Sequence, residues 1–428
     1  MKILVIGSGG REHAMAWRLA QGAKVQKVYV APGNAGTALE EGVENIAITA
    51  IPDMIEFVKR EDIYMTVVGP EVPLAAGVVD DFRAAGLKVF GPTKAAAQLE
   101  SSKDFAKAFM VRHNIPTAFY QTFTDAAEAR AYVAKRGAPI VIKADGLAAG
   151  KGVVVAMTHA EAIAAIDMML AQNDTSSSKP GGVGARVVIE EFLEGEEASF
   201  IVMVDGKNVL AMASSQDHKR LLDGDNGPNT GGMGAYSPAP VITPGLHARV
   251  LREVIQPVVR GMESEGITYT GFLYAGLMIS PGGEFKVLEF NCRMGDPETQ
   301  PIMLRLKSDF AVIVEHAIAG TLDRIEAEWD RRTALGVVLA AAHYPGTPRK
   351  GDAITGLQKK WEDAHIFHAG TTVQNGKIVT NGGRVLCVTA LGTMVKMAQK
   401  RAYEIAEDIH FEGCQMRRDI GYRAIGRK

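Results

Sequence analysis

Cysteine is scarce in this sequence, which has only Cys292, Cys387 and Cys414 among its 428 residues. Their number is odd and their spacing is wide, so they fit neither a disulfide framework nor a zinc-ligand pattern, and we expect a reducing compartment. Long apolar runs are lacking too. The first one is too short for a signal peptide, and none approaches the length of a membrane span. We therefore expect a cytoplasmic protein that has no membrane partner.

An excess of charge of one sign is also lacking. The chain has 47 basic and 49 acidic residues and a net charge of −2, so there is no basic footprint for nucleic acid and we expect no such partner. The Gly-x-Ser-x-Gly and His-Glu-x-x-His motifs are absent, which gives no support to covalent hydrolase or zinc protease chemistry. The length exceeds what one hydrophobic core serves and predicts about three domains.

Short apolar strands alternate with possible helices through about residue 100. The chain opens with an apolar strand that runs into the turn Gly7–Glu12, and a helix is expected from about His13 to Gln21. Each further strand ends in a turn that contains Gly or Pro, and we expect these strands at 27–31, 65–69 and 88–91. This alternation predicts a doubly wound parallel sheet, whose turns gather at the carboxyl edge where such sheets bind ligands.

The pattern changes after residue 100 and again near residue 326. Mixed strands and helices follow, including a hairpin of 271–279 with 285–290, and the C-terminal part has strands at 336–342 and 384–391. We therefore predict a multidomain protein of α/β and α+β class. Its parts are a Rossmann-like N-terminal domain, a central region and a mixed α/β C-terminal domain, at 1–100, 101–325 and 326–428.

One short segment near residue 290 carries the densest set of side chains suited to metal and phosphate. Read as a strand, its period of two places Glu289, Asn291 and Arg293 on one face, while Phe290 and Cys292 face the other way and can pack. A carboxylate and an amide oxygen are ligands that Mg²⁺ accepts, and an arginine can stabilise a transferred phosphoryl group. An isolated segment of this kind is more often a solvated strand edge, so the prediction depends on the rest of the chain.

The turn Gly7–Glu12 has part of a dinucleotide-binding fingerprint. Glu12 stands where the third glycine is required, and the second strand runs into Ala31–Asn34 instead of ending in an acid. The turn can still offer backbone N–H groups and a helix N-terminus to a phosphate. A phosphate site for a substrate therefore fits better than a nicotinamide site, and a plain tight turn is about equally consistent with these residues.

The glycine-rich loop Asp145–Gly152 resembles a Walker A loop but departs from it. It is one residue short between Gly146 and the Gly-Lys pair, and Gly152 replaces the Ser or Thr that holds magnesium. Such a loop can close over nucleotide phosphates through backbone donors. The alternative is a glycine-rich hairpin. Lys143 weakens that alternative, because it ends an apolar strand just before the loop, where a lysine usually has an anionic partner.

Two further segments favour contacts with a ligand. The strand at 186–192 runs into a cluster of carboxylates, so its backbone can bind an adenine edge while a nearby glutamate accepts from ribose hydroxyls. We interpret Glu194 and Glu196 in that cluster as solvated. The polar stretch 214–220 precedes the glycine-rich segment 226–236, which suits close approach of the backbone to a ligand.

Taken together, these segments resemble the ATP-grasp ligases, and within them the phosphoribosylamine–glycine ligase family. The resemblance is carried by residues 7–13, 31–37, 68–71, 143–152, 215–220, 227–236 and 289–300. It covers essentially the whole chain and ends in 381–386 and 418–421. It implies ATP-grasp central domains, with a lid subdomain at about 118–190 and a catalytic core at about 191–325. It also implies a reaction. ATP would phosphorylate the carboxylate of glycine, and the amine of 5-phosphoribosylamine would attack the acyl phosphate to give glycinamide ribonucleotide in purine synthesis.

The resemblance also implies roles for individual residues. Residues 146–152 would be the lid over the phosphates. ATP would be held by Lys103, Lys143, Gly146, Gly150, Lys151, Gly152, Glu190, Glu191, Phe192, Leu193 and Glu197. Glycine and the phosphoribosyl group would be held by Gly9, Gly10, Asn34, Asp217, Lys219, Asn229, Thr230, Gly231, Gly232, Met233, Arg293 and Asp296. Arg293 and Lys143 would be the catalytic groups, and the ligands of Mg²⁺ or Mn²⁺ would be Glu289 and Asn291.

One departure from the broader superfamily concerns the metal. Many ATP-grasp enzymes carry a second metal-binding acid on the preceding strand, but residues 274–279 include none. Either Glu289 and Asn291 act alone or a carboxylate from elsewhere substitutes. Three alternatives stay open: a ligase for another acid or amine, a nicotinamide-dependent dehydrogenase, and a nucleotide-binding regulator without turnover. We expect small-molecule partners and a monomer or weak homo-oligomer.

Overall fold

The N-terminal part of the chain folds around a parallel sheet. The structure is a computed structural model and describes residues 1–147, 152–171, 186–357 and 360–427. Five strands pair in parallel in the order β3-β2-β1-β4-β5, and they span Lys2–Gly7 (β1), Lys27–Pro32 (β2), Val43–Asn45 (β3), Met65–Val68 (β4) and Val89–Phe90 (β5). The helices are α1 (Gly10–Ala20), η1 (Thr37–Leu39), α2 (Ile51–Arg60), α3 (Glu71–Ala76) and α4 (Val78–Ala84). The predicted parallel sheet is confirmed.

The centre of this sheet shows why the sequence forms it. Ile3, Leu4, Val5 and Ile6 of β1 are buried on both faces, as is typical of a central parallel strand. The strand order reverses at β1, which pairs with β2 on one side and β4 on the other. The loops that follow β1 and β4 therefore flank a switch point, where open α/β sheets leave a crevice for ligands.

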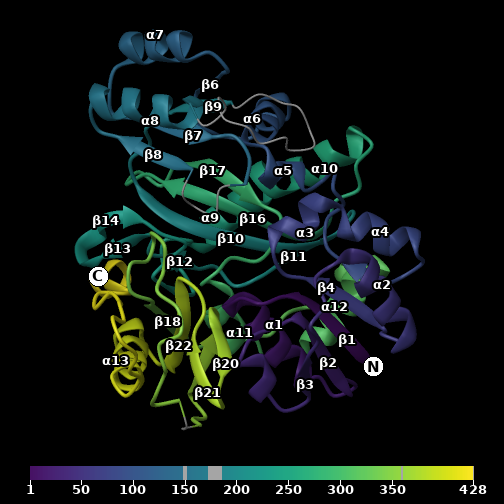
Figure 1. Cartoon of the computed structure of the whole chain (residues 1–428). Coiled ribbons are helices and arrows are strands. Elements are labelled where there is room, and N and C mark those ends of the chain that lie inside the picture. Colours follow the sequence, from purple (N-terminus) through teal and green to yellow (C-terminus); the bar gives the residue numbers. More distant parts are fainter. Residues whose placement is uncertain (148–151, 172–185, 358–359, 428) are drawn as a thin grey trace.

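A second, smaller sheet has its own core. Its strands run in the order β6-β9-β7-β8 and span Tyr120–Phe123 (β6), Ile140–Ala144 (β7), Val153–Ala156 (β8) and Val187–Glu191 (β9). Helices α7 (Ala126–Arg136) and α8 (His159–Ala171) pack on it around Val133, Ile142 and Ile189. In Figure 1 this sheet stands beside the central sheet, with α6 (Lys103–Arg112) next to it, while α5 (Gln98–Ser101) lies against the central sheet.

The central sheet contains the strand that ends in Glu289 and Asn291. It has the order β11-β10-β16-β17, with Glu196–Asp205 (β10), Val209–Ala211 (β11), Thr270–Ile279 (β16) and Phe285–Asn291 (β17). The predicted hairpin of β16 with β17 is confirmed, and its register shifts near Gly276, so that Leu288 forms a bulge. Phe290 and Cys292 are buried, as the alternation predicts, and the strand ends before Arg293. One face of the sheet is covered by α9 (Pro244–Val250), η3 (Leu251–Ile255) and α10 (Gln256–Ser264).

The C-terminal sheet is built from two distant parts of the chain. Its order is β12-β15-β18-β22-β19, with Gln216–Asp217 (β12), Gly234–Ser237 (β15), Thr333–Ala340 (β18), Ala364–His368 (β19) and Arg384–Gly392 (β22). The sheet therefore crosses residue 326, where the sequence predicts a boundary. Two hairpins, β13 (Arg220–Leu222) with β14 (Asn226–Asn229) and β20 (Thr371–Gln374) with β21 (Lys377–Thr380), lie beside it.

The remaining helices join these parts. They are η2 (Asp223–Asp225), α11 (Thr299–Arg305), α12 (Phe310–Ala319), η4 (Leu322–Arg324), α13 (Val395–Ala406) and α14 (Tyr422–Ile425). One hydrophobic cluster includes Met15 of α1, Ile302 of α11 and Val337 of β18, so the two ends of the chain share a core. Figure 1 shows α1 and α11 between the N-terminal and C-terminal sheets. In the described ranges, no helix combines the length and the apolarity that crossing a bilayer needs.

Candidate active site

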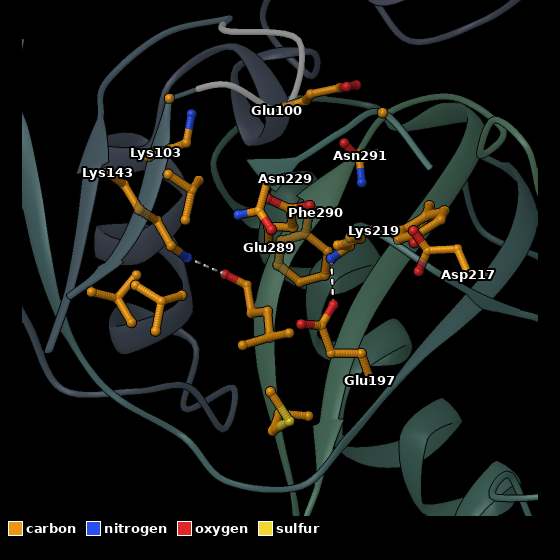
Figure 2. Close-up of a pocket in the computed structure, with 18 of the residues that line it drawn as sticks. Glu100, Lys103, Lys143, Glu197, Asp217, Lys219, Asn229, Glu289, Phe290 and Asn291 are labelled. Atoms are coloured by element: carbon orange, nitrogen blue, oxygen red, sulfur yellow. Dashed lines mark hydrogen bonds and ion pairs between the residues drawn. The ribbon is translucent and has the colours of Figure 1, made fainter. Parts of the chain in front are cut away.

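A cavity of about 850 Å³ lies where the parts of the chain meet. Its wall includes Glu71 from the N-terminal part, Glu289 from the central sheet and Arg384 from the C-terminal sheet. In Figure 2, Lys143 lies on one side of Glu289 and Lys219 on the other. The volume is typical of a small-molecule site, and the wall is dense in charge, which suits a polar, ionised substrate.

Glu289 and Asn291 on β17 form part of the cavity wall, as their spacing predicts. Glu289 pairs across the sheet with Gly276, which has no side chain to cover it. Within the described residues, the Glu289 carboxylate has no hydrogen bond or ion pair. Burial alone would raise its pKa, but cations that face it outweigh burial and hold the pKa below its usual value. They are Lys219, Lys143, Lys103 and Arg293.

This arrangement fits a hard divalent cation. Glu289 presents an ionised carboxylate with both oxygens unused by the described residues. The Oδ1 atom of Asn291 accepts a hydrogen bond from Nη2 of Arg293 at 3.1 Å and keeps a second lone pair. Carboxylate and amide oxygens are ligands of Mg²⁺ and Mn²⁺. The donor set can therefore hold a metal, and the paired strand contributes no carboxylate at Gly276.

Lys143 has the anionic partner that its apolar setting predicts. Its Nζ atom lies 2.9 Å from Oε1 of Glu190, and Oε2 of Glu190 lies 2.9 Å from Nζ of Lys107. Glu190 is only 3% exposed, so its side chain is committed to these two lysines and only its backbone can meet an adenine ring. Burial lowers the pKa of Lys107 to about 8, against the opposing charge of Glu190. The three side chains, all of which line the cavity, form one ion-paired cluster, which we call the lysine clamp.

Lys103 connects helix α6 to the start of the glycine loop. Its Nζ donates to the carbonyl of Gly146 at 2.8 Å, and its backbone N–H donates to Oδ1 of Asp145 at 2.7 Å. Gly146 has φ +104 and nothing within 4 Å of where a Cβ would stand, so the backbone there is free to approach a ligand. Gly146 and Gly152 both line the cavity. Gly150 and Lys151 lie outside the described residues.

The segment predicted to meet a nucleoside lies along one edge of the cavity. Glu191, Phe192, Leu193 and Glu197 all line it. The carboxylate of Glu191 lies 3.0 Å from Nζ of Lys286, and the Glu191 N–H donates to the carbonyl of Phe119 at 2.9 Å. Glu197 forms an ion pair with Lys219, which is drawn in Figure 2.

The predicted substrate residues divide into two groups. Asp217, Lys219, Asn229, Thr230, Gly231, Arg293 and Asp296 line the cavity. Arg384 joins two of them, because its Nη1 donates to the carbonyls of Gly231 at 2.8 Å and Asp296 at 2.6 Å. Burial would lower the pKa of Lys219, but Glu197, Asp217 and Glu289 outweigh it and raise that pKa well above its usual value. Lys219 is therefore a permanent cation.

The second group lies outside the described cavity wall: Gly9, Gly10, Asn34, Gly232 and Met233. Met233 is fully buried in the core shared by the two ends of the chain. The Asn34 amide donates to the carbonyls of Ser8 at 2.9 Å and His368 at 2.8 Å, so its side chain holds loops together. The Gly9 N–H donates to Oε2 of Glu12 at 2.7 Å, so a carboxylate of the chain already occupies this turn.

Arg293 is held from both sides by acids that sequence reasoning missed. Its Nη2 lies 2.9 Å from Oε1 of Glu100, and its Nε lies 3.4 Å from Oε2 of Glu71. Burial would lower the pKa of Arg293, but these acids outweigh it and raise that pKa further. Glu100 also accepts from the N–H of Cys292 at 2.7 Å, which fixes the chain just beyond β17.

Other cavity residues also escaped the sequence argument, namely Lys107, Glu298, Arg384, Tyr422 and Arg423. Three of them had a signal in the sequence that could have found them. Lys107 follows Lys103 by one helical turn and so shares its face, and Glu298 lies within the 289–300 segment that carries the resemblance. Arg384 lies within 381–386, to which the resemblance extends, whereas Tyr422 and Arg423 had no such signal, because only the fold brings them to the cavity.

Family models match nearly the whole chain. The N, ATP-grasp and C domains of phosphoribosylglycinamide synthetase match residues 1–100, 101–299 and 334–423. The chain belongs to the phosphoribosylglycinamide synthetase family. Proteins named phosphoribosylamine–glycine ligase from Ralstonia nicotianae and Escherichia coli O157:H7 are 68% and 62% identical to it, each over 100% of both chains.

Solved structures of this family and of more distant proteins have a similar fold. The crystal structure of phosphoribosylamine–glycine ligase from Thermotoga maritima is 37% identical, with a TM-score of 0.83, and covers 98% of this chain and 100% of that one. The biotin carboxylase domain of 2-oxoglutarate carboxylase from Hydrogenobacter thermophilus has a TM-score of 0.73 at 15% identity, over 97% of this chain and 91% of that one. This second likeness shows a shared fold and nothing more.

Proposed function

We propose that this protein ligates glycine to 5-phosphoribosylamine at the expense of ATP, through glycyl phosphate, to give glycinamide ribonucleotide, ADP and phosphate. The observation that carries the proposal is the ionised Glu289 beside Asn291, in a cavity of lysines, in a chain of this family. The names of its relatives, phosphoribosylamine–glycine ligase, supply the two substrates.

The charges of the side chains that line the cavity support a role for each of them in binding ATP and the metal. Lys103 and Lys143 neutralise ATP phosphates, Gly146 and Gly152 lie beside them at the two ends of the glycine loop, and the backbone of 191–193 meets the adenine. Glu197 receives the ribose. Glu289 and Asn291 would hold the divalent cation, Mg²⁺ or Mn²⁺, which would supply neutralising charge for the phosphates when bound.

The chemistry requires positioning and charge neutralisation rather than a protein nucleophile. A carboxylate oxygen of glycine attacks the γ-phosphoryl group, and ADP leaves. The phosphoribosylamine nitrogen then attacks the acyl carbon, and phosphate leaves. Arg293 faces the oxygens of the acyl phosphate, because Glu71 and Glu100 hold its guanidinium at the end of β17. Asp217, Lys219, Asn229, Thr230, Gly231 and Asp296 shape the pocket for glycine and the phosphoribosyl group.

We further propose that small molecules are the partners, that the protein works in the cytoplasm, and that it is a monomer or weak homo-oligomer. Support comes from composition, since the net charge is −2 and cysteines are few. Sedimentation of the purified protein at several concentrations would measure its association.

The test is ADP production by the purified protein with Mg-ATP. Glycine and freshly generated 5-phosphoribosylamine are added separately and then together. Turnover that requires both, with glycinamide ribonucleotide detected by mass spectrometry, is the expected result. ATP binding without turnover on this pair would overturn the proposed substrates while keeping the nucleotide site.

A further inference from the structure

A segment near the C-terminal end of the described chain lies against the cavity and has no part in the roles above. Two of its side chains, Tyr422 and Arg423, line the cavity. Figure 1 shows this end of the chain beside the hairpin of β13 and β14. We call residues 417–427 the C-terminal clasp. Because Asn229 and other residues of the hairpin also line the cavity, the contacts between the hairpin and the C-terminal clasp shape one part of its wall.

Asp225, in the turn of this hairpin, is the anion at which three side chains of the C-terminal clasp meet. Its Oδ1 lies 2.8 Å from Nη1 of Arg417, and its Oδ2 lies 2.7 Å from Nη2 of Arg423. Tyr422 Oη donates to Oδ2 at 2.5 Å. Burial would raise the pKa of Asp225, but these three partners outweigh it and hold that pKa well below its usual value. The carboxylate is therefore ionised, and both of its oxygens are bound within the chain.

The turn and the C-terminal clasp are also joined by backbone groups. Arg417 is 0% exposed, and its Nε lies 2.7 Å from Oδ1 of Asp419. The Oδ2 atom of Asp419 accepts from the N–H of Gly224 at 2.8 Å. In the other direction, the N–H of Arg418 donates to Oδ1 of Asp223 at 2.7 Å. A buried arginine needs such anionic partners, so the turn cannot move away without leaving a buried charge unpaired.

The backbone of the turn needs this support. Gly224 and Asp225 have φ of +66 and +55, both in the left-handed region. Glycine adopts this conformation freely, whereas the Cβ of any other residue makes it less stable. Asp225 therefore depends on the bonds to its carboxylate to hold a conformation that its backbone does not favour.

The hairpin is continuous with residues of the substrate pocket. Asn229 ends β14. Just beyond it, the N–H and the Oγ1 of Thr230 donate to the carbonyl of Lys219 at 2.7 and 2.8 Å. The C-terminal clasp adds a contact of its own, because Nη1 of Arg423 donates to the carbonyl of Asp217 at 3.2 Å. Lys219, Asn229 and Thr230 therefore belong to one hydrogen-bonded unit with the turn that the C-terminal clasp holds.

We propose that Asp225 is a positioning residue for the ligation, which anchors the hairpin to the C-terminal clasp and so fixes the pocket for glycine and the phosphoribosyl group. This rests on the proposed function, because that function supplies the two substrates. Asp225 acts through Lys219, Asn229 and Thr230 and touches no substrate itself. Each nitrogen of Arg423 donates to a group of the chain, which fits a role in holding the wall and not in binding a substrate.

The first experiment measures the steady-state kinetics of wild type and Asp225→Asn, with ATP, glycine and phosphoribosylamine varied in turn. Asparagine keeps the shape of the side chain and removes the charge that pairs with Arg417 and Arg423. The matched control is Asp363→Asn, because Asp363 also pairs with an arginine, Arg401 at 3.0 Å, but lies outside the described cavity wall.

We expect KM for phosphoribosylamine and for glycine to rise about 10-fold in Asp225→Asn, the low end of the range for a lost charged hydrogen bond. KM for ATP and kcat should stay within about twofold of wild type, because Lys103 and Lys143 lie on α6 and β7, away from the hairpin. Asp363→Asn should match wild type. Unchanged KM values, or an equal rise for ATP, would overturn the proposal. Wild-type protein that binds ATP without turnover would overturn the proposed function instead.

Amide hydrogen exchange tests the anchor without any turnover. In Asp225→Asn the amides of 219–230 should exchange about 10-fold faster than in wild type, because the hairpin opens locally, while those of β16 should not change. Equal exchange of 219–230 in the two proteins would contradict the proposal. If Asp225→Asn does not fold, Tyr422→Phe removes one hydrogen bond to Asp225 and should raise the same two KM values about threefold. Unchanged values in that variant would also overturn the proposal.

Discussion

The turn after β1 and the end of β17 both look like ligand sites in the sequence, yet their polar groups differ in the structure. At the turn, the Gly9 N–H donates to Glu12 at 2.7 Å, and the other Glu12 oxygen lies 2.5 Å from Nε of Arg11. At the end of β17, the Glu289 carboxylate has no such partner within the described residues. We therefore expect the turn, whose Gly9 N–H is bonded within the chain, to contribute mainly to the fold, and the buried Glu289 charge, which has no partner within the described residues, to bind a ligand.

Glu40, His13 and His365 form a second group of side chains whose partners lie within the chain. Glu40 lies 2.8 Å from Nε2 of His13 and 2.7 Å from Nε2 of His365, close enough for the three to hold a metal. However, Nδ1 of His13 accepts from the N–H of His368 at 2.8 Å. The neutral ring therefore carries its proton on Nε2, where a metal would need a lone pair. The group is a hydrogen-bonded link between α1 and β19, and we call it the histidine link.

The comparison predicts that charged groups paired within the chain govern stability, and that charged groups without a partner in the chain govern turnover. The largest stability effect should come from Glu190→Gln, which leaves two buried lysines of the lysine clamp without their anion. We expect a loss of about 3–5 kcal/mol in the free energy of unfolding, measured with urea. Glu194→Gln is the control, because Glu194 is exposed, and it should change stability by less than about 0.5 kcal/mol. Equal free energies of unfolding for the two variants would show that the ion pairs of Glu190 do not govern stability.

Glu289→Gln tests whether the carboxylate without a partner governs turnover. It keeps the shape of the side chain and removes a charge that the metal and phosphates need, so we expect kcat for ADP release to fall about 10²- to 10³-fold. The free energy of unfolding should change far less than in Glu190→Gln. Wild-type turnover in this variant would mean that the metal is held elsewhere.

Glu12→Ala should have a smaller effect, confined to folding. It removes the acceptor for the Gly9 N–H and the partner of Arg11, so we expect a loss of about 1–3 kcal/mol in unfolding free energy. The specific activity of the folded fraction should stay within about twofold of wild type. Glu56→Ala, on an exposed face of α2, is the control. A selective rise in KM for phosphoribosylamine would instead show that the turn binds substrate.

Glu40→Gln should have the smallest effect, about 1 kcal/mol in unfolding free energy at pH 7. Burial would raise the pKa of Glu40, but hydrogen bonds from His13 and His365 outweigh it and lower that pKa below 4.5. Its stabilisation is therefore complete above about pH 4.5 and is lost as the pH falls toward the folded-state pKa. Urea unfolding from pH 7 to pH 4 should show the gap between wild type and variant narrowing. A gap that widens on acidification would contradict the assigned charge.

Much of the local structure was predictable because it depends on neighbours in sequence. The alternation of apolar strands predicted the parallel sheet around β1, and the period of two predicted that Phe290 and Cys292 are buried. Lys143 at the end of an apolar strand predicted an anionic partner. Its identity, Glu190, was not predictable, because β7 and β9 are adjacent only in the folded sheet.

The sequence by itself determined the family, the ligase chemistry and the segment that carries Glu289 and Asn291. The tertiary structure alone decided which polar groups are satisfied within the chain. It placed Glu12 on the Gly9 N–H, the acids Glu71 and Glu100 on Arg293, and the C-terminal Arg384 against the cavity. The physical reason is that partners for a buried charge come from any part of the chain that packing brings within hydrogen-bond distance, and no local pattern records which part that is.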